Sequence, residues 1–294
     1  MRWEHIQGKT DCVFTRGEAM ALYHIREGEV LLFDSGDEPC PELLDELERR
    51  GLRVRAVLCT HLHPDHVANN GILVERYGAE ILAGQEDIRI VSSDTLYCEE
   101  YGLVDDVAAA RAERARQYSY PMTPIPEGAT SVMVDEVRIG VLPTPGHSRG
   151  HLALITPDGV CCVGDALISS RILKVSKMPY MLDVNQAILS MEVLRESRYP
   201  FYVVSHREVV PQAELSRLVD DNIEKELQIY GLLLHQIDGA VSVDELAKRL
   251  LRSADVINPS SMRADVLLQT ARARVMGLVD AGELCYENGM VSHR

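Results

Sequence analysis

The sequence is poor in the features that mark membrane, secreted and nucleic-acid-binding proteins. It has no run of 18 apolar residues that could cross a bilayer, and its start, MRWEHIQGKTDC, lacks the pattern of a signal peptide. Positive charge is scarce, because 30 Lys and Arg face 45 Asp and Glu, giving a net charge of −15. Binding to DNA, RNA or anionic membranes needs clustered Lys and Arg. We therefore expect a soluble cytoplasmic protein without a membrane partner, and a nucleic-acid partner is disfavoured.

Cysteine is too scattered to form a disulfide framework. The seven cysteines include no CxxC pair and their number is odd, which also argues against a zinc ribbon. The adjacent Cys161 and Cys162 lie in the apolar run VCCVG. We expect both thiols to pack in the core.

The sequence does contain enough apolar material for a large core. It has 294 residues, of which 46% are hydrophobic, so one large domain or one domain with a small appendage is expected. In the first two thirds, strand-like runs such as VRAVLCT and VCCVGDAL alternate with helical patterns such as PELLDELERRG and NQAILSMEVLRES. This alternation predicts an α/β layered protein.

The pattern becomes mainly helical near the C-terminus. A long helical pattern covers residues 211–236, and a second helix is expected after Ser242, which forms a capping-box pattern with Glu245. A third follows in RADVLLQTARARVMGLVDAGEL, and CYENGMVSHR can close as a hairpin. Three helices and a hairpin describe a winged-helix-like module. We therefore predict a catalytic domain at 1–210 and a winged-helix-like domain at 211–294.

The stretch CTHLHPDHVANN concentrates ligand-type side chains at the end of a predicted strand. Within six positions it contains His61, His63, Asp65 and His66. Imidazole and carboxylate groups are the ligands that zinc and iron use in hydrolases. The i, i+2 spacing of His61 and His63 points both side chains the same way in an extended loop. The cluster therefore predicts a metal site rather than a polar loop.

Further ligand-type residues follow other predicted strands. His147 lies in TPGHSRGH after VRIGVLPT, Asp165 follows VCCVG, and His206 ends FYVVSH. Strand ends on one side of a sheet gather in space. We therefore expect these three side chains to converge on the histidine cluster.

In this order, the motifs H-x-H-x-D-H, T-P-G-H-S-x-G-H, G-D and a strand ending in His resemble the metallo-β-lactamase superfamily, and most closely its glyoxalase II-like branch. The resemblance covers about residues 1–207. It implies an αββα sandwich with the metals at one edge. The C-terminal part resembles the winged-helix appendage of some superfamily members, whereas glyoxalase II has a different C-terminal domain that contributes to glutathione binding.

The resemblance also implies roles for individual residues. Two sets of ligands, for a first and a second metal, would be His61, His63 and His147, and Asp65, His66 and His206. Asp165 would bridge the two metals. Asp34, in LLFDSG, and His151 would orient the ligands from behind.

These residues predict a metal-dependent hydrolase that uses a metal-bridging hydroxide on a small-molecule ester, thioester or lactone. Two divalent ions, with Zn²⁺ as the first candidate and iron or manganese as alternatives, would lower the pKa of a shared water. Asp65 is the candidate to receive its proton.

The sequence gives weaker signals for the residues that contact the substrate than for the metal ligands. The segment ISSRILKVSKMPYMLD carries Arg171, Lys174, Lys177 and Tyr180, and its local positive charge could meet an anionic substrate tail. The helical stretch 86–122 is expected to cover the site. Its Tyr118 and Tyr120 either line the site or pack in the core.

Three other functions share these motifs. The superfamily includes RNA-processing enzymes, so an endoribonuclease or phosphodiesterase is one alternative, and a mononuclear iron persulfide dioxygenase is another. A metal-stabilised regulator is the third. Residues 207–294 contain ten Lys and Arg against fourteen Asp and Glu, a net charge of −4, with mainly Arg272 and Arg274 on the third helix. We therefore expect the C-terminal module to serve packing or homodimerisation rather than nucleic-acid binding.

Overall fold

The computed structural model describes residues 1–103, 107–256 and 261–294, and the side chains of 261–263 lie outside the description. Parts of the predicted helical stretch 86–122 and of the predicted module 211–294 therefore fall outside it. Among the described residues, no helix is long and apolar enough to cross a membrane.

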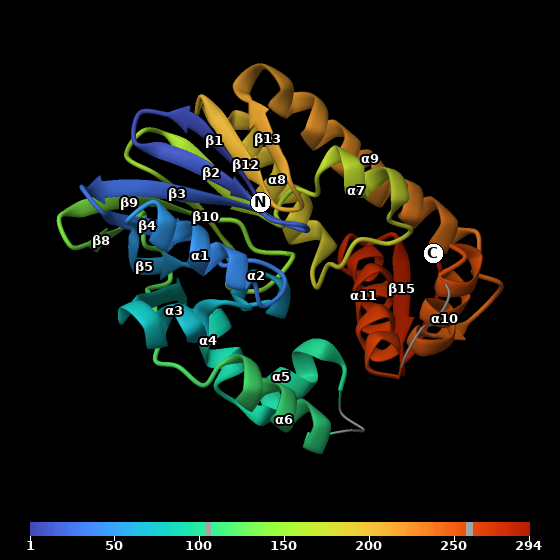
Figure 1. Cartoon of the computed structure of the whole chain (residues 1–294). Helices are drawn as coiled ribbons and strands as arrows, with labels where there is room; N and C mark the ends of the chain where they lie inside the picture. Colours follow the sequence, from blue (N-terminus) through green and yellow to red (C-terminus); the bar gives the residue numbers. More distant parts are fainter. Residues whose placement is uncertain (104–106, 257–260) are drawn as a thin grey trace.

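Two mixed sheets pack against each other, with helices around them (Figure 1). The first contains, in spatial order, β1 (Arg2–Gln7), β2 (Thr10–Phe14), β3 (Ala19–Arg26), β4 (Glu29–Phe33), β5 (Arg53–Leu58), β6 (Glu80–Gly84) and β7 (Thr123–Ile125). The second runs β13 (Glu208–Pro211), β12 (Phe201–Val204), β11 (Val160–Gly164), β10 (Leu152–Ile155), β9 (Val137–Pro143) and β8 (Ser131–Val134). Strands β4 to β7 are parallel to one another, as are β11 and β12.

Alternation along the strands builds separate cores on the two faces of each sheet. In β4, Leu31 and Phe33 face the other sheet, whereas Leu32 joins a cluster with the helices outside. Cys161 and Cys162 are both buried and point to opposite faces of β11, as expected for core residues. Because side chains in a strand alternate with period two, one apolar run can fill both cores.

Helices cover the outer faces of the sheets. Helices α1 (Pro41–Arg49) and α3 (Asn70–Tyr77) pack on the first sheet, and α8 (Val184–Glu196) packs on the second. The predicted αββα sandwich is thereby confirmed. The predicted helical stretch 86–122 consists of α4 (Gln85–Val91), α5 (Asp94–Tyr101) and α6 (Val107–Gln117).

The C-terminal part contains the three predicted helices and the hairpin. In chain order it consists of α9 (Gln212–Leu234), β14 (Val241–Ser242), α10 (Val243–Ser253), α11 (Ser261–Asp280), β15 (Leu284–Glu287) and β16 (Met290–His293). Ser242 Oγ accepts a hydrogen bond from the Glu245 amide at 3.2 Å, as the capping-box pattern predicts. Asn288 and Gly289 have φ of 49° and 80°, as a two-residue hairpin turn requires. These helices share one apolar cluster with the second sheet and α8, so the boundary at 210/211 stays a prediction.

Some strands were not anticipated from the sequence. β1, β2 and β7 extend the first sheet, and β13 adds an edge strand next to β12 in the second. β13 pairs with β12 as a short antiparallel hairpin, from Val204 with Glu208 to Phe201 with Pro211. A four-residue strand has too short a pattern to be recognised alone.

Candidate metal centre

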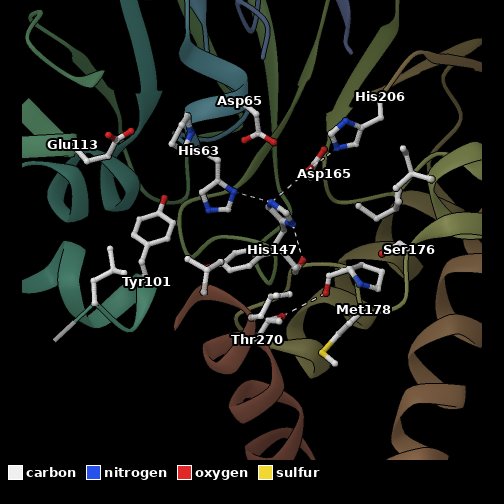
Figure 2. Close-up of a pocket in the computed structure, with 18 of the residues that line it drawn as sticks. His63, Asp65, Tyr101, Glu113, His147, Asp165, Ser176, Met178, His206 and Thr270 are labelled. Carbon is white, nitrogen blue, oxygen red and sulfur yellow. Dashed lines mark hydrogen bonds and ion pairs between the residues drawn. The ribbon is translucent and has the colours of Figure 1, made fainter. Parts of the chain in front are cut away.

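The predicted ligands converge where strands of both sheets end. His61 and His63 follow β5, and α2 (Pro64–Val67) begins immediately after them. His147, Asp165 and His206 follow β9, β11 and β12. Figure 2 shows His63, His147, Asp165 and His206 side by side along one wall of a pocket, with Asp65 pointing into the same space.

Within the described part of the chain, potential ligand atoms form three overlapping groups, each spanning no more than 4.8 Å. One group is His61, His63 and His147, a second is His61, His66 and Asp165, and a third is Glu18, His66 and His206. The structure therefore brings together six of the seven predicted ligands. Asp65 is half-buried and lines the pocket, but it belongs to none of these groups among the described residues.

Asp165 lies between the histidine groups. Its Oδ1 is 3.5 Å from His66 Nε2, and its Oδ2 is 3.5 Å from His147 Nε2 and 3.4 Å from His206 Nε2. His63 Nδ1 is 2.9 Å from His147 Nε2. One carboxylate thus reaches nitrogens of both predicted ligand sets.

Hydrogen bonds on the far side of the rings decide the histidine tautomers. His66 Nδ1 donates to Asp34 Oδ2 at 3.1 Å, His147 Nδ1 donates to the Tyr180 carbonyl at 3.0 Å, and His206 Nδ1 contacts Glu18 Oε1 at 2.7 Å. Carboxylates and carbonyls only accept, so each Nδ1 carries a proton. When the rings are neutral, their Nε2 lone pairs can therefore face a metal, as in carboxylate–histidine–metal arrangements.

His61 is oriented through a chain of hydrogen bonds. Thr60 Oγ1 donates its single proton to Asp34 Oδ2 at 2.8 Å, and His61 Nδ1 lies 3.0 Å from the same hydroxyl. The hydroxyl must therefore accept from His61 Nδ1, which leaves Nε2 unprotonated. Asp34 has a φ of 60°, an uncommon conformation outside glycine. Its carboxylate accepts hydrogen bonds from both Thr60 and His66. The structure thus places Asp34 behind two ligands.

His151 supports the Asp165 backbone. Its Nε2 accepts from the Asp165 amide at 3.1 Å, and its Nδ1 lies 2.8 Å from Thr144 Oγ1. Gly164, at φ 52°, leaves room for this contact, since a Cβ there would lie 2.8 Å from His151 Nε2 and 2.5 Å from Thr60 Oγ1. Any side chain at position 164 would displace the loop that carries Asp165.

Burial and neighbouring charges divide the histidines into two types. Burial lowers the pKa of His63 and of His147 to about 3, and burial also lowers the pKa of His61, so these rings are neutral. Burial alone would lower the pKa of His206, but the Asp165 and Glu18 carboxylates outweigh it and raise that pKa to about 11. The pKa of His66 is raised against burial in the same way, by Asp165 and Asp34. A cation that binds to these two rings would displace the second proton.

The residues fit a metal centre. The Nε2 atoms of His61, His63 and His66 and Oδ1 of Asp165 are buried without a hydrogen-bond partner. Buried polar atoms are almost always paired, because leaving them unpaired costs about 1–3 kcal/mol each. Four such atoms, converging with neutral imidazoles and a carboxylate, form the donor set that zinc, iron or manganese prefers.

Two acidic residues of the site were not identified from the sequence. Glu18 is 1% exposed and accepts from the His206 amide at 2.9 Å in addition to its contact with the ring. Asp87 accepts from Ser148 Oγ and from the Gly150 and Leu62 amides, so it ties the two histidine loops together. Asp87 follows β6, and the strand-end rule could have found it. The run TRGEAM around Glu18 carries no comparable signal.

Replacing Glu18 by glutamine should weaken metal binding selectively. Glutamine can accept one of the two hydrogen bonds from His206, but it lacks the negative charge that holds the His206 ring. We expect the more weakly held ion to lose about 10–100-fold in affinity, measured by competition with a chelator, while the other ion is unaffected. Asp11→Asn is the matched control, because Asp11 contacts His5 and His24 at the surface. Equal affinities in Glu18→Gln and wild type would contradict the assignment.

The pocket beside the cluster has a volume of about 440 Å³. Its lining residues outside the ligand cluster and Pro64 are Tyr97, Tyr101, Leu103, Glu113, Ile168, Ile172, Ser176, Met178, Pro179, Tyr180, Val266, Leu267 and Thr270. Tyr180 is the one residue of the predicted substrate contacts that lines it. Arg171, Lys174 and Lys177 do not line it: all three are exposed, and Lys177 lies 3.9 Å from Asp255, so their contact with a substrate stays a prediction.

Helices α5 and α6 contribute to the pocket, as expected, but through different tyrosines. Tyr118 and Tyr120 pack in the core, where their hydroxyls bond to the Leu62 carbonyl and to Asn70. Tyr97 and Tyr101 line the pocket instead, and the Tyr101 ring centre is 5.7 Å from that of His63. Tyr97 and Tyr101 lie one turn apart on α5 and so share a face, whereas Tyr118 and Tyr120 follow the end of α6.

Comparisons with known proteins agree with this geometry. A sequence model described as the metallo-beta-lactamase superfamily matches residues 18–206. Hydroxyacylglutathione hydrolase of Methylobacillus flagellatus is 28% identical over 147 residues, which cover 49% of this chain and 46% of that protein. The chain thus spans about half the length of that curated relative.

Solved structures share the fold. A metallo-beta-lactamase family protein from Thermus thermophilus superposes with a TM-score of 0.72 at 21% identity, over 94% of each chain. ETHE1 from Myxococcus xanthus gives a TM-score of 0.52 at 17% identity, over 91% of this chain and 99% of that one. At these identities the likeness shows the fold alone.

Proposed function

The chain belongs to the metallo-β-lactamase superfamily, and we propose that it is a dinuclear metal-dependent hydrolase of a small-molecule ester, thioester or lactone. The observation that carries the proposal is the position of Asp165. Its two oxygens lie 3.4–3.5 Å from nitrogens of His66, His147 and His206, which belong to different ligand groups. A closed structural zinc site would need four ligands and no such bridging carboxylate.

The ligand groups define two positions. The first would be held by His61, His63 and His147, and the second by His66 and His206, with Asp165 between them and Asp65 nearby. When bound, two divalent ions, Zn²⁺ or alternatively iron or manganese, lower the pKa of a shared water and polarise the substrate carbonyl.

The protein's own groups would orient the imidazole ligands and accept the proton of the attacking water. Asp34, Glu18 and the Tyr180 carbonyl hold the imidazole tautomers, so no ring has to reorganise during the reaction. Asp65 faces the pocket and is the carboxylate placed to receive the proton of the attacking water (Figure 2). A thiolate or carboxylate leaving group would need little help from an acid.

The name of the Methylobacillus relative describes hydrolysis of an acyl group from glutathione, which supports a thioester substrate class here. An endoribonuclease or phosphodiesterase is less well supported. On α11, Arg272 bonds to Asp244, and Arg274 is fully buried against Glu226. These two cations, the main ones on that helix, are therefore not free to contact phosphates.

Metal content and activity test the proposal together. Purified protein should bind about two divalent ions per chain, measured by elemental analysis. It should hydrolyse members of a panel of thioesters, esters and lactones, lose activity with a chelator, and regain it with Zn²⁺, Mn²⁺ or Fe²⁺. A single tightly held iron, with oxygen consumption on a persulfide and no hydrolysis, would instead establish the dioxygenase alternative.

A further inference from the structure

The pocket at the metal centre has walls from distant parts of the chain. Tyr101 and Leu103 come from the end of α5, Ile172 comes from α7 (Ser170–Val175), and Leu267 and Thr270 come from α11. In Figure 2, Thr270 and Met178 lie across the pocket from Asp65 and His206. The C-terminal helix therefore forms part of the site, although the sequence indicated only a packing or dimerisation role for this region.

Helix α11 is held firmly in that position. Thr270 Oγ1 accepts from the Met181 amide at 2.8 Å, and Arg274 donates to the Pro179 carbonyl at 2.8 Å. Val266 packs against the cluster that contains Tyr101 and Leu103. The wall is thus tied to the catalytic part by hydrogen bonds on one side and by apolar contacts on the other.

The pocket walls are largely apolar, and none of the described lining residues is Lys or Arg. Leu103, Ile168, Ile172, Val266 and Leu267 supply aliphatic surface. Among the described residues, neither Lys nor Arg lines the pocket, and the one charged side chain outside the ligand cluster is that of Glu113. Recognition of a carboxylate or phosphate tail generally uses Arg or Lys. The carboxylates of a glutathione moiety would find neither Lys nor Arg among the described residues of the lining.

We propose that this pocket is an acyl-binding subsite, in which the apolar chain of an uncharged ester or thioester lies against α11. The proposal rests on the hydrolase function proposed above and names its substrate class. The pocket volume of about 440 Å³ falls in the range of small-molecule pockets. In the reaction, the oxygen of water joins the acyl carbon, the C–S or C–O bond breaks, and the products are a carboxylic acid and a thiol or alcohol.

The test compares acyl chain lengths on one uncharged thiol. Acetyl and octanoyl thioesters of N-acetylcysteamine are hydrolysed by the metal-loaded full chain, beside octanoyl-glutathione. We expect kcat/KM for the octanoyl thioester to exceed that for the acetyl thioester at least 10-fold, since burial of two methylenes suffices for that ratio. The glutathione thioester should be the poorer octanoyl substrate.

Leu267→Ala should lower kcat/KM for the octanoyl thioester about 10-fold and leave the acetyl value within about 2-fold. Leu268→Ala is the matched control, because Leu268 is next along α11 but packs into the core cluster instead of the pocket. It should leave the chain-length ratio unchanged. If Leu267→Ala does not fold, Ile172→Ala, at the pocket-lining position on α7, should show the same selective loss.

A second measurement separates the two proposals. The non-hydrolysable S-octyl thioether of N-acetylcysteamine should bind in calorimetry, and Leu267→Ala should weaken it about 10-fold. Binding without hydrolysis of any thioester would overturn the hydrolase but keep the subsite. Hydrolysis that is equally fast with the acetyl chain, or faster with glutathione, would overturn the subsite and keep the hydrolase.

Discussion

Asp165→Asn is expected to reduce kcat/KM at least about 1000-fold while leaving the fold intact. Asparagine has the same shape but removes the charge that lies among His66, His147 and His206. Loss of metal-centred charge stabilisation worth several kcal/mol corresponds to a rate loss of this size. The metal content should also fall from about two ions per chain towards one.

The measurement pairs kinetics with elemental analysis and thermal melting of the metal-free protein. Asp238→Asn is the control, because it removes the same charge at an exposed position. A melting temperature close to wild type would show that the loss is chemical. Activity within 10-fold of wild type would mean that Asp165 does not bridge the two positions.

Arg274→Met is expected to destabilise the protein by about 3–5 kcal/mol. Arg274 is 0% exposed and pairs with Glu226, which is 1% exposed, at 2.8 Å. Removing one partner of a buried pair leaves the other charge without compensation. The same change removes the donor to the Pro179 carbonyl, next to the Tyr180 carbonyl that holds His147. Thermal unfolding should therefore shift downwards by roughly 10 °C.

Arg272→Met provides a matched control on the same helix. Arg272 pairs with Asp244 at the surface, where such pairs contribute less than about 1 kcal/mol. The double variant Glu226→Leu/Arg274→Met should recover part of the lost stability, since it removes both charges. A single Arg274→Met variant that melts within about 2 °C of wild type would show that the pair is not stabilising.

Much of the fold was predictable because its signals are local. The strand VRAVLCT, the cap at Ser242 and the turn at Asn288–Gly289 each depend on a few neighbouring residues, and each is present. β13 escaped prediction because its pairing with β12, rather than its own four residues, makes it a strand. Local patterns specify elements, whereas a very short edge strand is defined by the strand with which it pairs.

Most of the candidate metal ligands were also predictable from local sequence signals. His61, His63 and His66 could be identified by spacing, and His147, Asp165 and His206 by their places at strand ends. Those are short-range properties of the chain. The resemblance to a known superfamily then supplied their order.

The tertiary structure alone decided which other groups complete the site. Glu18 contacts His206 across 188 positions of sequence, and α11 reaches the pocket from the far end of the chain. It also left Arg171, Lys174 and Lys177 outside the set of residues that line the pocket. The direction of a side chain follows from helix register and from the packing of distant elements, and neither is written in the residues beside it. The sequence by itself thus determined the set of metal-ligand-type residues in this protein, and the packing of its distant segments decided the shape and polarity of the pocket beside them.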